Sequence, residues 1–349
     1  AVATGPELGS RLVAAPDKFR GTATAAQVAA AIAGAAERAG WACDQVPVAD
    51  GGEGTLDALG GAAHHTTVSG PLGQPVSAEW RMQPGGTAVI EMARASGIAL
   101  VGGPEGNDPL RASTRGTGEL IAAALDAGAA RVIVGVGGSA TTDGGLAALT
   151  ALNPGRRLRG AAEVLVACDV TTRFVDAAEV FAPQKGATPA QVALLRRRLE
   201  RLAEVYVRDY DVDVRQLPGS GAGGGLAGGL AAAGAVLVPG FDLVAESLDL
   251  AERIAGADLV VTGEGHLDAE SFAGKAVGGV VALAGEAGVP VLIVAGGVDA
   301  DGLPPDLPPG VKVVSLVERF GFDEATWDPI GCIEAIVYAE LAATPRADG

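Results

Sequence analysis

The stretch Arg131–Leu152 joins residues that together could hold a nucleotide phosphate. A β-branched run ends in Gly135, the pair Gly137–Gly138 follows, and Ser139 and Asp143 precede a run typical of a helix. A strand, a glycine turn and a helix start form an anion site, because unpaired N–H groups and the helix dipole act in the same direction. A carboxylate at Asp143 would repel that anion unless a divalent cation lay between them. The stretch therefore predicts a magnesium–nucleotide site.

The lysines provide a second indication of phosphate chemistry. The chain has 25 basic residues, and all of them are arginines except Lys18, Lys185, Lys275 and Lys312. The first three stand in loops flanked by glycine or proline, and a compact ammonium on a flexible stem suits a moving phosphoryl group. The pattern favours a functional role for Lys185 and a strand-edge position for Lys312. For Lys18 and Lys275, a functional role and an ordinary loop position fit the pattern equally well.

Acidic residues gather where strands are expected to end. Six lie at or just after the ends of apolar runs: Asp17, Asp50, Glu53, Asp169, Glu264 and Asp268. Any one of them could cap a helix or close a turn. Several at one edge of a parallel sheet favour metal coordination together with a general base. Of the three histidines, the adjacent His64 and His65 are expected on the surface, and His266 is a candidate substrate contact.

The elements that must position these residues alternate in the manner of an α/β fold. Strands are expected at Arg11–Ala15 and Cys43–Asp50, and three more within Asp258–Glu318, with helices between them. The segment His64–Met92 instead alternates polar and apolar residues and carries Gly-Pro punctuation, which is typical of antiparallel hairpins. From Ser113 onward the α/β pattern resumes.

This change of pattern predicts two domains, which a length of 349 residues accommodates. Residues 1–65 plus 241–349 are expected to form a discontinuous parallel-sheet domain, and residues 66–240 an inserted mixed α/β domain. The active site is expected in the cleft between them, because ligands gather at domain interfaces and at the carboxyl ends of parallel strands.

The composition indicates which classes of binding partner the protein is expected to lack. A net charge of −17 argues against nucleic acid and anionic membrane surfaces as partners. Three distant cysteines suggest neither a disulfide framework nor a metal motif. The first residues lack a signal-peptide pattern, so a cytoplasmic protein is expected. The uncharged stretch Gly219–Gly240 is rich in glycine and is expected to form a loop and a packed helix rather than a membrane span.

Other enzyme classes have weaker support. The turn at Gly135–Ala140 also matches the dinucleotide-binding pattern, so a nicotinamide-dependent oxidoreductase is the main alternative. For an oxidoreductase, Asp169 lies farther downstream than the acidic residue that the dinucleotide-binding pattern expects. Asp143 would also repel a pyrophosphate whose charge is not compensated. A second match, Gly219–Gly224, is expected to be a loop, although a backbone-donor role for it stays open. Hydrolase signatures, the P-loop and the protein-kinase motif set do not occur in the sequence.

Taken together, the motifs resemble the type I bacterial glycerate kinase family. The similarity runs in order along nearly the whole chain and rests on Ala15–Gly21, Val48–Thr55, Gly116–Leu120, Gly137–Thr141, Asp143–Gly145, Ala167–Val170, Pro183–Ala187, Thr262–Gly265 and Leu267–Asp268. The resemblance implies ATP-dependent phosphorylation of D-glycerate with Mg²⁺, typically at the 2-hydroxyl. It also implies two α/β domains, of which the flavodoxin-like one is built from both chain ends.

Three positions depart from the family pattern. Thr142 stands where the family usually has Asn, Ala182 where it usually has Gly, and His266 where it usually has Arg. Thr142 keeps a hydroxyl that could serve a metal or phosphate. His266 matters more if that position holds the glycerate carboxylate, because histidine is mostly neutral at pH 7.

The predicted mechanism is phosphoryl transfer by positioning and charge neutralisation. ATP is expected on the turn made of Gly137, Gly138, Ser139, Ala140 and Thr141, and Mg²⁺ on Asp143 and Asp169. Asp169 is favoured over Asp17 as the base, and Lys185 would steady the transferring group. Contacts to D-glycerate are expected among Lys18, Arg20, Asp50, Glu53, Glu264, His266, Asp268 and Lys275. A non-catalytic ligand sensor and either a monomer or a homodimer remain open.

Overall fold

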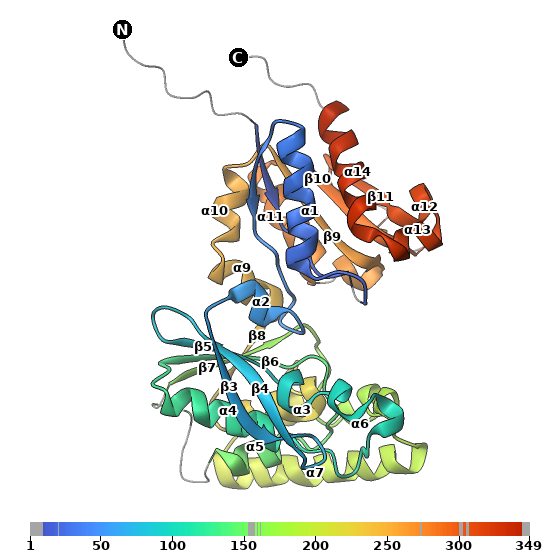
Figure 1. Cartoon of the computed structure of the whole chain (residues 1–349). Helices are drawn as coiled ribbons and strands as arrows, with labels where there is room; N and C mark the ends of the chain where they lie inside the picture. Colours follow the sequence, from blue (N-terminus) through green and yellow to red (C-terminus); the bar gives the residue numbers. More distant parts are fainter. Residues whose placement is uncertain are drawn as a thin grey trace. The chain divides into compact units, whose positions relative to one another are not determined.

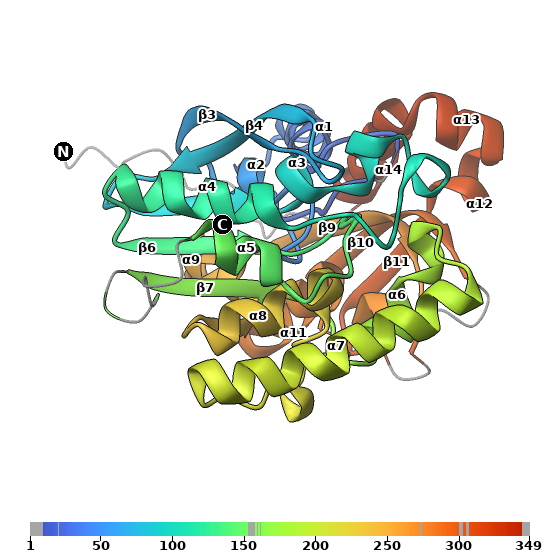
Figure 2. The ribbon, with the colours of Figure 1, turned by 90° about the horizontal axis from the view of Figure 1, so that it is seen from below.

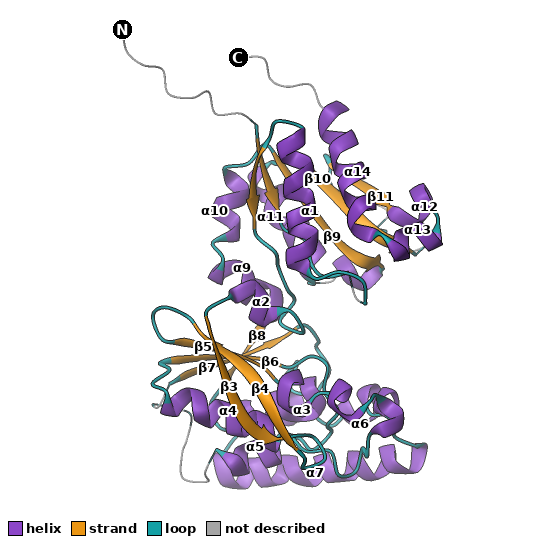
Figure 3. Cartoon of the chain, in the orientation of Figure 1, coloured by secondary structure: helices purple, strands orange, loops and turns teal. Residues whose placement is uncertain are grey.

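The computed structural model contains two separate β-sheets, each with its own helices (Figure 1). It describes residues 10–19, 21–152, 158, 160, 162–272, 274–299, 303–304 and 307–343. The chain divides into an outer unit, within Ala1–Ala49 and Val244–Gly349, and an inserted unit, Asp50–Leu243. Figure 3 shows the strands of each sheet flanked by helices.

The sheet of the outer unit is parallel throughout and has the strand order β11-β10-β9-β1-β2. Its strands are β1 (Arg11–Ala14), β2 (Ala42–Gln45), β9 (Leu259–Leu267), β10 (Val291–Val298) and β11 (Val311–Ser315). Renumbered within this unit, the order is the 2-1-3-4-5 order of flavodoxin-like folds. The order reverses between β1 and β9, and such a switch point is where open α/β sheets bind ligands.

The helices of the outer unit cover this sheet and hold its core. They are α1 (Ala25–Arg38), α10 (Leu250–Ala255), α11 (Ala276–Ala287), α12 (Leu316–Phe320), α13 (Phe322–Trp327) and α14 (Pro329–Ala343). Helix α1 begins with a capping box in which Thr24 and Gln27 each accept a hydrogen bond from the other's main-chain N–H. Its apolar face packs with α14, so that Ile32 and Ile333 are fully buried. Each such side chain contributes about 1.5–3 kcal/mol by burial.

The inserted unit has a mixed six-stranded sheet in the order β3-β4-β5-β6-β7-β8. Its strands are β3 (Ala62–Ser69), β4 (Pro75–Met82), β5 (Thr87–Glu91), β6 (Arg131–Gly135), β7 (Glu163–Cys168) and β8 (Val236–Pro239). The first three pair antiparallel, which confirms the interpretation of His64–Met92, and β5 to β8 pair parallel. The carboxyl ends of β5, β6 and β7 therefore lie at one edge of the sheet.

Helices on this sheet build a second core. They are α2 (Thr55–Leu59), α3 (Ala93–Ser96), α4 (Arg115–Asp126), α5 (Leu146–Ala151), α6 (Ala177–Phe181), α7 (Pro189–Tyr210) and α8 (Leu226–Ala232), with α9 (Gly240–Ser247) leading back to the outer unit. The 22-residue α7 contacts α8 (Figure 2). The stretch Gly219–Gly240 forms a 3₁₀ turn, α8, β8 and the start of α9. Among the described residues, no helix is long and apolar enough to cross a membrane.

The first boundary lies closer to the N-terminus than residue 65, because contacts tie α2 and its preceding loop to the inserted unit. The carboxylate of Glu91, at the end of β5, accepts hydrogen bonds from the N–H groups of Gly54 (2.9 Å) and Leu56 (3.0 Å). From β4, Arg81 donates to the Leu56 carbonyl (3.0 Å) and to the Asp57 carboxylate (2.6 Å). These partners are 24 to 37 residues away along the chain, so a local pattern does not reveal them.

Candidate functional site

The glycine turn after β6 lies directly against the loop that follows Asp50. A Cβ atom on Gly137 would stand 2.9 Å from the Cα of Gly52, and one on Gly135 would stand 2.5 Å from the Gly51 carbonyl oxygen. Glycine is required at both positions because the opposing atoms belong to the main chain. The structure thus brings the loop of Asp50, one of the predicted substrate contacts, to the predicted nucleotide turn.

The turn presents main-chain donors that the fold does not use. The Gly138 carbonyl accepts a hydrogen bond from the N–H of Ile98 (2.9 Å), and the N–H of Ala140 donates to the Ser96 carbonyl (2.9 Å). Among the described residues, no group accepts a hydrogen bond from the N–H of Gly137, Gly138 or Ser139. Three successive N–H groups of this kind suit an anion such as phosphate.

The helix dipole contributes less to this site than the sequence indicated. Helix α5 begins only at Leu146, after Gly145 in a left-handed conformation with φ of 79°. Six residues, 140–145, therefore separate Ser139 from the first helical turn, and they include the bend at Gly144–Gly145. The anion-binding capacity of the turn rests on its own N–H groups rather than on the start of α5.

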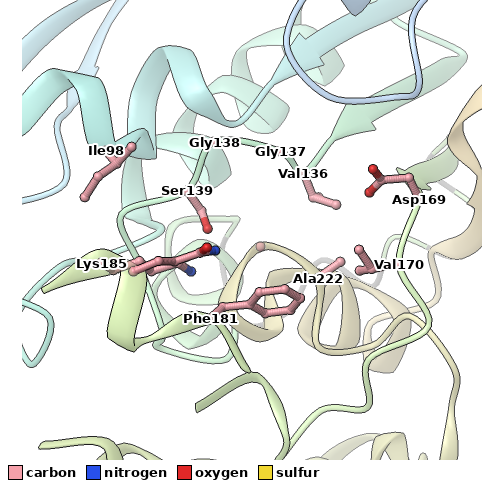
Figure 4. A pocket seen from close by; sticks show the side chains of 12 residues that line it. Ile98, Val136, Gly137, Gly138, Ser139, Asp169, Val170, Phe181, Lys185 and Ala222 are labelled. Atoms are coloured by element: carbon pink, nitrogen blue, oxygen red, sulfur yellow. The ribbon is translucent and has the colours of Figure 1, made fainter. Parts of the chain in front are cut away.

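A pocket of about 270 Å³ lies beside the glycine turn, within the inserted unit (Figure 4). It is lined by Ile98, Val136, Gly137, Gly138, Ser139, Asp169, Val170, Phe181, Gln184, Lys185, Ala222 and Gly223. Figure 4 shows Ser139 and Lys185 on one side of the pocket and Asp169 on the other. Predicted site residues that are up to 48 positions apart therefore share one cavity, because the ends of β6 and β7 are adjacent.

Lys185 is the buried cation of this pocket, with only 4 % of its surface exposed. Its ammonium donates a hydrogen bond to the Thr141 carbonyl (2.6 Å) and lies 5.9 Å from the centre of the Phe181 ring. Burial lowers the pKa of Lys185 to about 7, because desolvation disfavours the charged form, and the nearby Asp143 carboxylate opposes that change. A group with this pKa is protonated below neutral pH and loses its charge above it.

Asp143 does not line the pocket, in contrast to its predicted role as a magnesium ligand beside Asp169. One carboxylate oxygen accepts hydrogen bonds from the N–H (2.9 Å) and hydroxyl (2.8 Å) of Thr114, and the other accepts one from the N–H of Gly145 (3.1 Å). Burial raises the pKa of Asp143, whereas these hydrogen bonds act to lower it. Asp169 is exposed at the pocket edge, so it is the more accessible acid for a hydrated cation. Among the described residues, no group of three or more histidine, cysteine or acidic side chains suits a metal ion.

Other predicted residues lie at the switch point of the outer unit. The N–H of Asp17, after β1, donates to the Gly263 carbonyl of β9 (2.9 Å), and Lys18 lies 3.6 Å from the Asp17 carboxylate. Glu264 has one buried oxygen without a hydrogen-bond partner. Burial raises the pKa of Glu264, and the negative charges of Asp17 and Asp268 raise it further. The structure thus places Asp17, Lys18, Glu264 and Asp268 in one electrostatically coupled cluster, and the positive charge of Lys275 lowers the pKa values of Glu264 and Asp268 in it.

The remaining predicted contacts have other partners or other surroundings. His266 is 2.8 Å from the carboxylate of Asp299, and both side chains are exposed. Lys275 pairs with Glu270 at 2.9 Å in addition to its effect on Glu264 and Asp268, and Glu53 is exposed in the Asp50 loop. Arg20 lies outside the described residues.

Several residues of the site carry no chemical signal in the sequence. Phe181 and Gln184 line the pocket as part of the segment that bears Lys185. Asn107 contacts that same segment, and Thr114 holds Asp143. Two signals did point to such residues: Gln184 belongs to the motif Pro183–Ala187, and the glycine-rich stretch Gly219–Gly224 supplies Ala222 and Gly223 to the pocket wall.

Comparison with known proteins supports a single family. Residues 12–160 and 153–319 match the model of the glycerate kinase family. The chain is 40% identical over 331 residues to glycerate 2-kinase of Escherichia coli K12, with 83% of this chain and 86% of that protein covered. It is 39% identical over 330 residues to glycerate kinase of Bacillus subtilis 168, with the same coverage.

A solved structure extends this likeness to the fold. The crystal structure of a protein described as glycerate kinase 2, from Salmonella typhimurium LT2, has a TM-score of 0.80 and 35% identity, and the match covers 96% of this chain and 98% of that one. The fold and the pocket, with these matches, define an enzyme of the kinase class. The chain belongs to the glycerate kinase family.

Proposed function

We propose that this protein transfers the γ-phosphoryl group of ATP to the 2-hydroxyl of D-glycerate. The observation that carries the proposal is the pocket in which three unpaired N–H groups and the buried ammonium of Lys185 lie together. The 40% identity to a glycerate 2-kinase supports the 2-hydroxyl as the acceptor. Neither the oxidoreductase nor the sensor alternative has comparable support.

The phosphates of ATP would bind to the N–H groups of Gly137, Gly138 and Ser139. These donors are held in place before the substrate arrives, so they need no reorganisation as charge develops in the transition state. The protonated ammonium of Lys185 would stabilise the charge on the transferring group. Because Lys185 is buried, its interaction with a phosphate is screened less than a surface contact would be.

Magnesium would neutralise phosphate charge and orient the phosphate chain when it is bound. Mg²⁺ commonly takes one or two carboxylates together with phosphate oxygens and water. Asp169 fits this role because its carboxylate is exposed at the edge of the pocket. Asp143 does not fit, since both of its oxygens already accept hydrogen bonds. Asp169 is also the carboxylate we favour to accept the proton of the glycerate hydroxyl.

Recognition of D-glycerate is assigned to the coupled cluster of the outer unit. Lys18 would pair with the substrate carboxylate, and the unpartnered oxygen of Glu264 would accept a hydrogen bond from a substrate hydroxyl. A buried acceptor without a partner costs free energy, and a hydroxyl donor from the substrate would remove that cost.

Phosphorus NMR of the product tests the proposal directly. The protein is incubated with D-glycerate and Mg-ATP, and we expect the signal of 2-phosphoglycerate to grow as ADP forms. A 3-phosphoglycerate signal would contradict the assignment of the acceptor, and the absence of phosphoglycerate would contradict the proposed reaction. Lys185→Met is the matched variant and should lower kcat by about 100-fold or more. When NAD⁺ or NADP⁺ is added to the same mixture, the absorbance of reduced nicotinamide should stay constant, which an oxidoreductase would not allow.

A further inference from the structure

A closed ring of hydrogen bonds connects Lys185 to the glycine turn. The side-chain amide of Asn107 donates to two main-chain carbonyls, those of Ala140 (3.0 Å) and Lys185 (2.9 Å). The ammonium of Lys185 in turn donates to the carbonyl of Thr141, the residue that follows Ala140 (2.6 Å). Lys185 is thus held at its main chain and at its side-chain end, and both contacts lead to the same short segment of the turn.

The main chains of the segments that meet in this ring are in close contact. Gly186 adopts φ of 92°, and a Cβ atom there would stand 2.4 Å from the Pro104 carbonyl oxygen. The N–H of Lys185 donates to the Ala182 carbonyl (3.1 Å), which closes the 3₁₀ turn Pro183–Lys185. Because the main chains are in direct contact here, the side chain of Asn107 reaches both carbonyls without spanning open space.

The chemistry of the ring requires an amide. A primary amide carries two N–H donors, and the Asn107 amide uses one for each carbonyl. A carboxylate in its place has no donor and would repel both carbonyl oxygens, and an aliphatic side chain of similar size would leave both carbonyls unpaired. The ring is therefore sensitive to substitutions that preserve side-chain volume.

We propose that Asn107 is a positioning residue, which fixes the ammonium of Lys185 relative to the N–H groups of Gly137, Gly138 and Ser139. This inference rests on the proposed function, in which both sets of donors act on the same phosphate chain. Asn107 itself does not line the pocket, so it acts through Lys185 rather than on the substrate. Displacement of a catalytic group by about 1 Å can cost about 100-fold in rate.

A double-mutant cycle separates positioning from general stabilisation. The four proteins are wild type, Asn107→Leu, Lys185→Met and the double variant. We expect Asn107→Leu to lower kcat by about 30- to 100-fold in the presence of Lys185, with a smaller change in KM for D-glycerate. In the Lys185→Met background the same substitution should change kcat by less than about twofold, because the group that Asn107 positions is gone.

The same cycle is measured on binding of Mg-AMP-PNP by calorimetry, which does not depend on turnover. Asn107→Leu should weaken that binding about tenfold when Lys185 is present and less than about twofold when it is not. Equal effects of Asn107→Leu in both backgrounds, or wild-type behaviour of Asn107→Leu, would overturn the inference. If the wild type forms no phosphoglycerate but the binding cycle shows the coupling, the proposed function fails and the positioning role stands.

Two further variants complete the test. Asn107→Asp removes the donors while it preserves the shape of the side chain, so it should reproduce the loss seen with Asn107→Leu. Glu105→Gln, an exposed position in the same 3₁₀ turn Pro104–Gly106, should keep kcat within about twofold of wild type. Circular dichroism and urea unfolding of every variant show whether each one is folded under the assay conditions.

Discussion

Thr114 donates both its main-chain N–H (2.9 Å) and its hydroxyl (2.8 Å) to one oxygen of Asp143. Thr114 is fully buried, and its hydroxyl oxygen also accepts a hydrogen bond from the N–H of Ala148 (3.1 Å). The pair therefore joins the starts of α4 and α5 around one carboxylate. Asp143 thus has hydrogen-bond partners within the fold and an electrostatic effect on Lys185, and its predicted role as a metal ligand stays a prediction.

Thr114→Val should destabilise the protein, although the two side chains have nearly the same volume. The valine keeps the shape of the side chain but leaves an oxygen of Asp143 with one donor fewer and the N–H of Ala148 without an acceptor. We expect the free energy of unfolding to fall by about 1–3 kcal/mol, measured by urea denaturation. Thr150→Val, at an exposed position of α5, is the control and should change it by less than about 0.5 kcal/mol. Equal stability of the two variants would contradict this account.

Asp143→Asn tests the electrostatic role of the carboxylate through the pH profile of kcat. Burial lowers the pKa of Lys185 to about 7, and the charge of Asp143 opposes that effect. Without the charge, the pKa of Lys185 should fall further. The rate, which requires the protonated ammonium, should then decline with rising pH at a lower pH than in wild type.

The same variant separates this role from metal binding. Because Asp143 does not line the pocket, the Mg²⁺ concentration for half-maximal rate should match that of wild type. A several-fold increase in that concentration, with an unchanged pH profile, would assign Asp143 to the metal instead. Rates are compared after normalisation to the maximum of each variant, so that loss of overall activity does not obscure either readout.

Gly137→Ala should weaken nucleotide binding because it displaces the turn. The added methyl group would lie 2.9 Å from the Cα of Gly52, so one of two main-chain segments must move. We expect the Kd for Mg-AMP-PNP to rise by about tenfold or more, measured by calorimetry. Gly285→Ala is the matched control, since nothing lies within 4 Å of its added methyl group in α11. That variant should bind the nucleotide normally and gain up to about 1 kcal/mol of stability.

Glu264→Gln should raise stability at neutral pH while it lowers activity. Burial and the neighbouring Asp17 and Asp268 raise the pKa of Glu264 above its value in the unfolded chain. Ionisation of Glu264 therefore costs stability as the pH rises through the folded-state pKa, and this cost is absent below the unfolded-state value. The variant should be more stable than wild type at pH 7 and should lose that advantage near pH 4, as measured by urea unfolding.

The activity of Glu264→Gln provides the second half of this test. If the carboxylate binds a hydroxyl of D-glycerate, kcat/KM for D-glycerate should fall by about tenfold or more. Glu286→Gln, at an exposed position of α11, should change neither stability nor kcat/KM. A wild-type kcat/KM for Glu264→Gln would remove this residue from substrate recognition.

Local patterns were sufficient for many of the elements and for part of the pocket, but they missed β8 (Val236–Pro239), which lies in a stretch expected to be a loop and a helix. The alternation in His64–Met92 predicted the antiparallel strands, because side chains in a half-buried strand repeat every two residues. The glycine turn and the flanked Lys185 were singled out from residue type alone, and they share one pocket. The position of residues 50–65 was not predictable in this way, because Glu91 and Arg81 bind that segment across the sheet.

The amino-acid sequence by itself determined the α/β class, the glycine turn, the acids at strand ends and the family to which the chain belongs. The class, the turn and the acids depend on residue type and on spacing over a few positions, whereas the family depends on a series of short motifs in order along nearly the whole chain. Only the tertiary structure decided that Asp143 binds Thr114, that Asp169 and Lys185 share a pocket, and that Asn107 connects Lys185 to the turn. The two hydrogen-bonded relationships join residues that are 29 and 78 positions apart, and Asp169 and Lys185 come from two different elements, so no local pattern of residue types contains them.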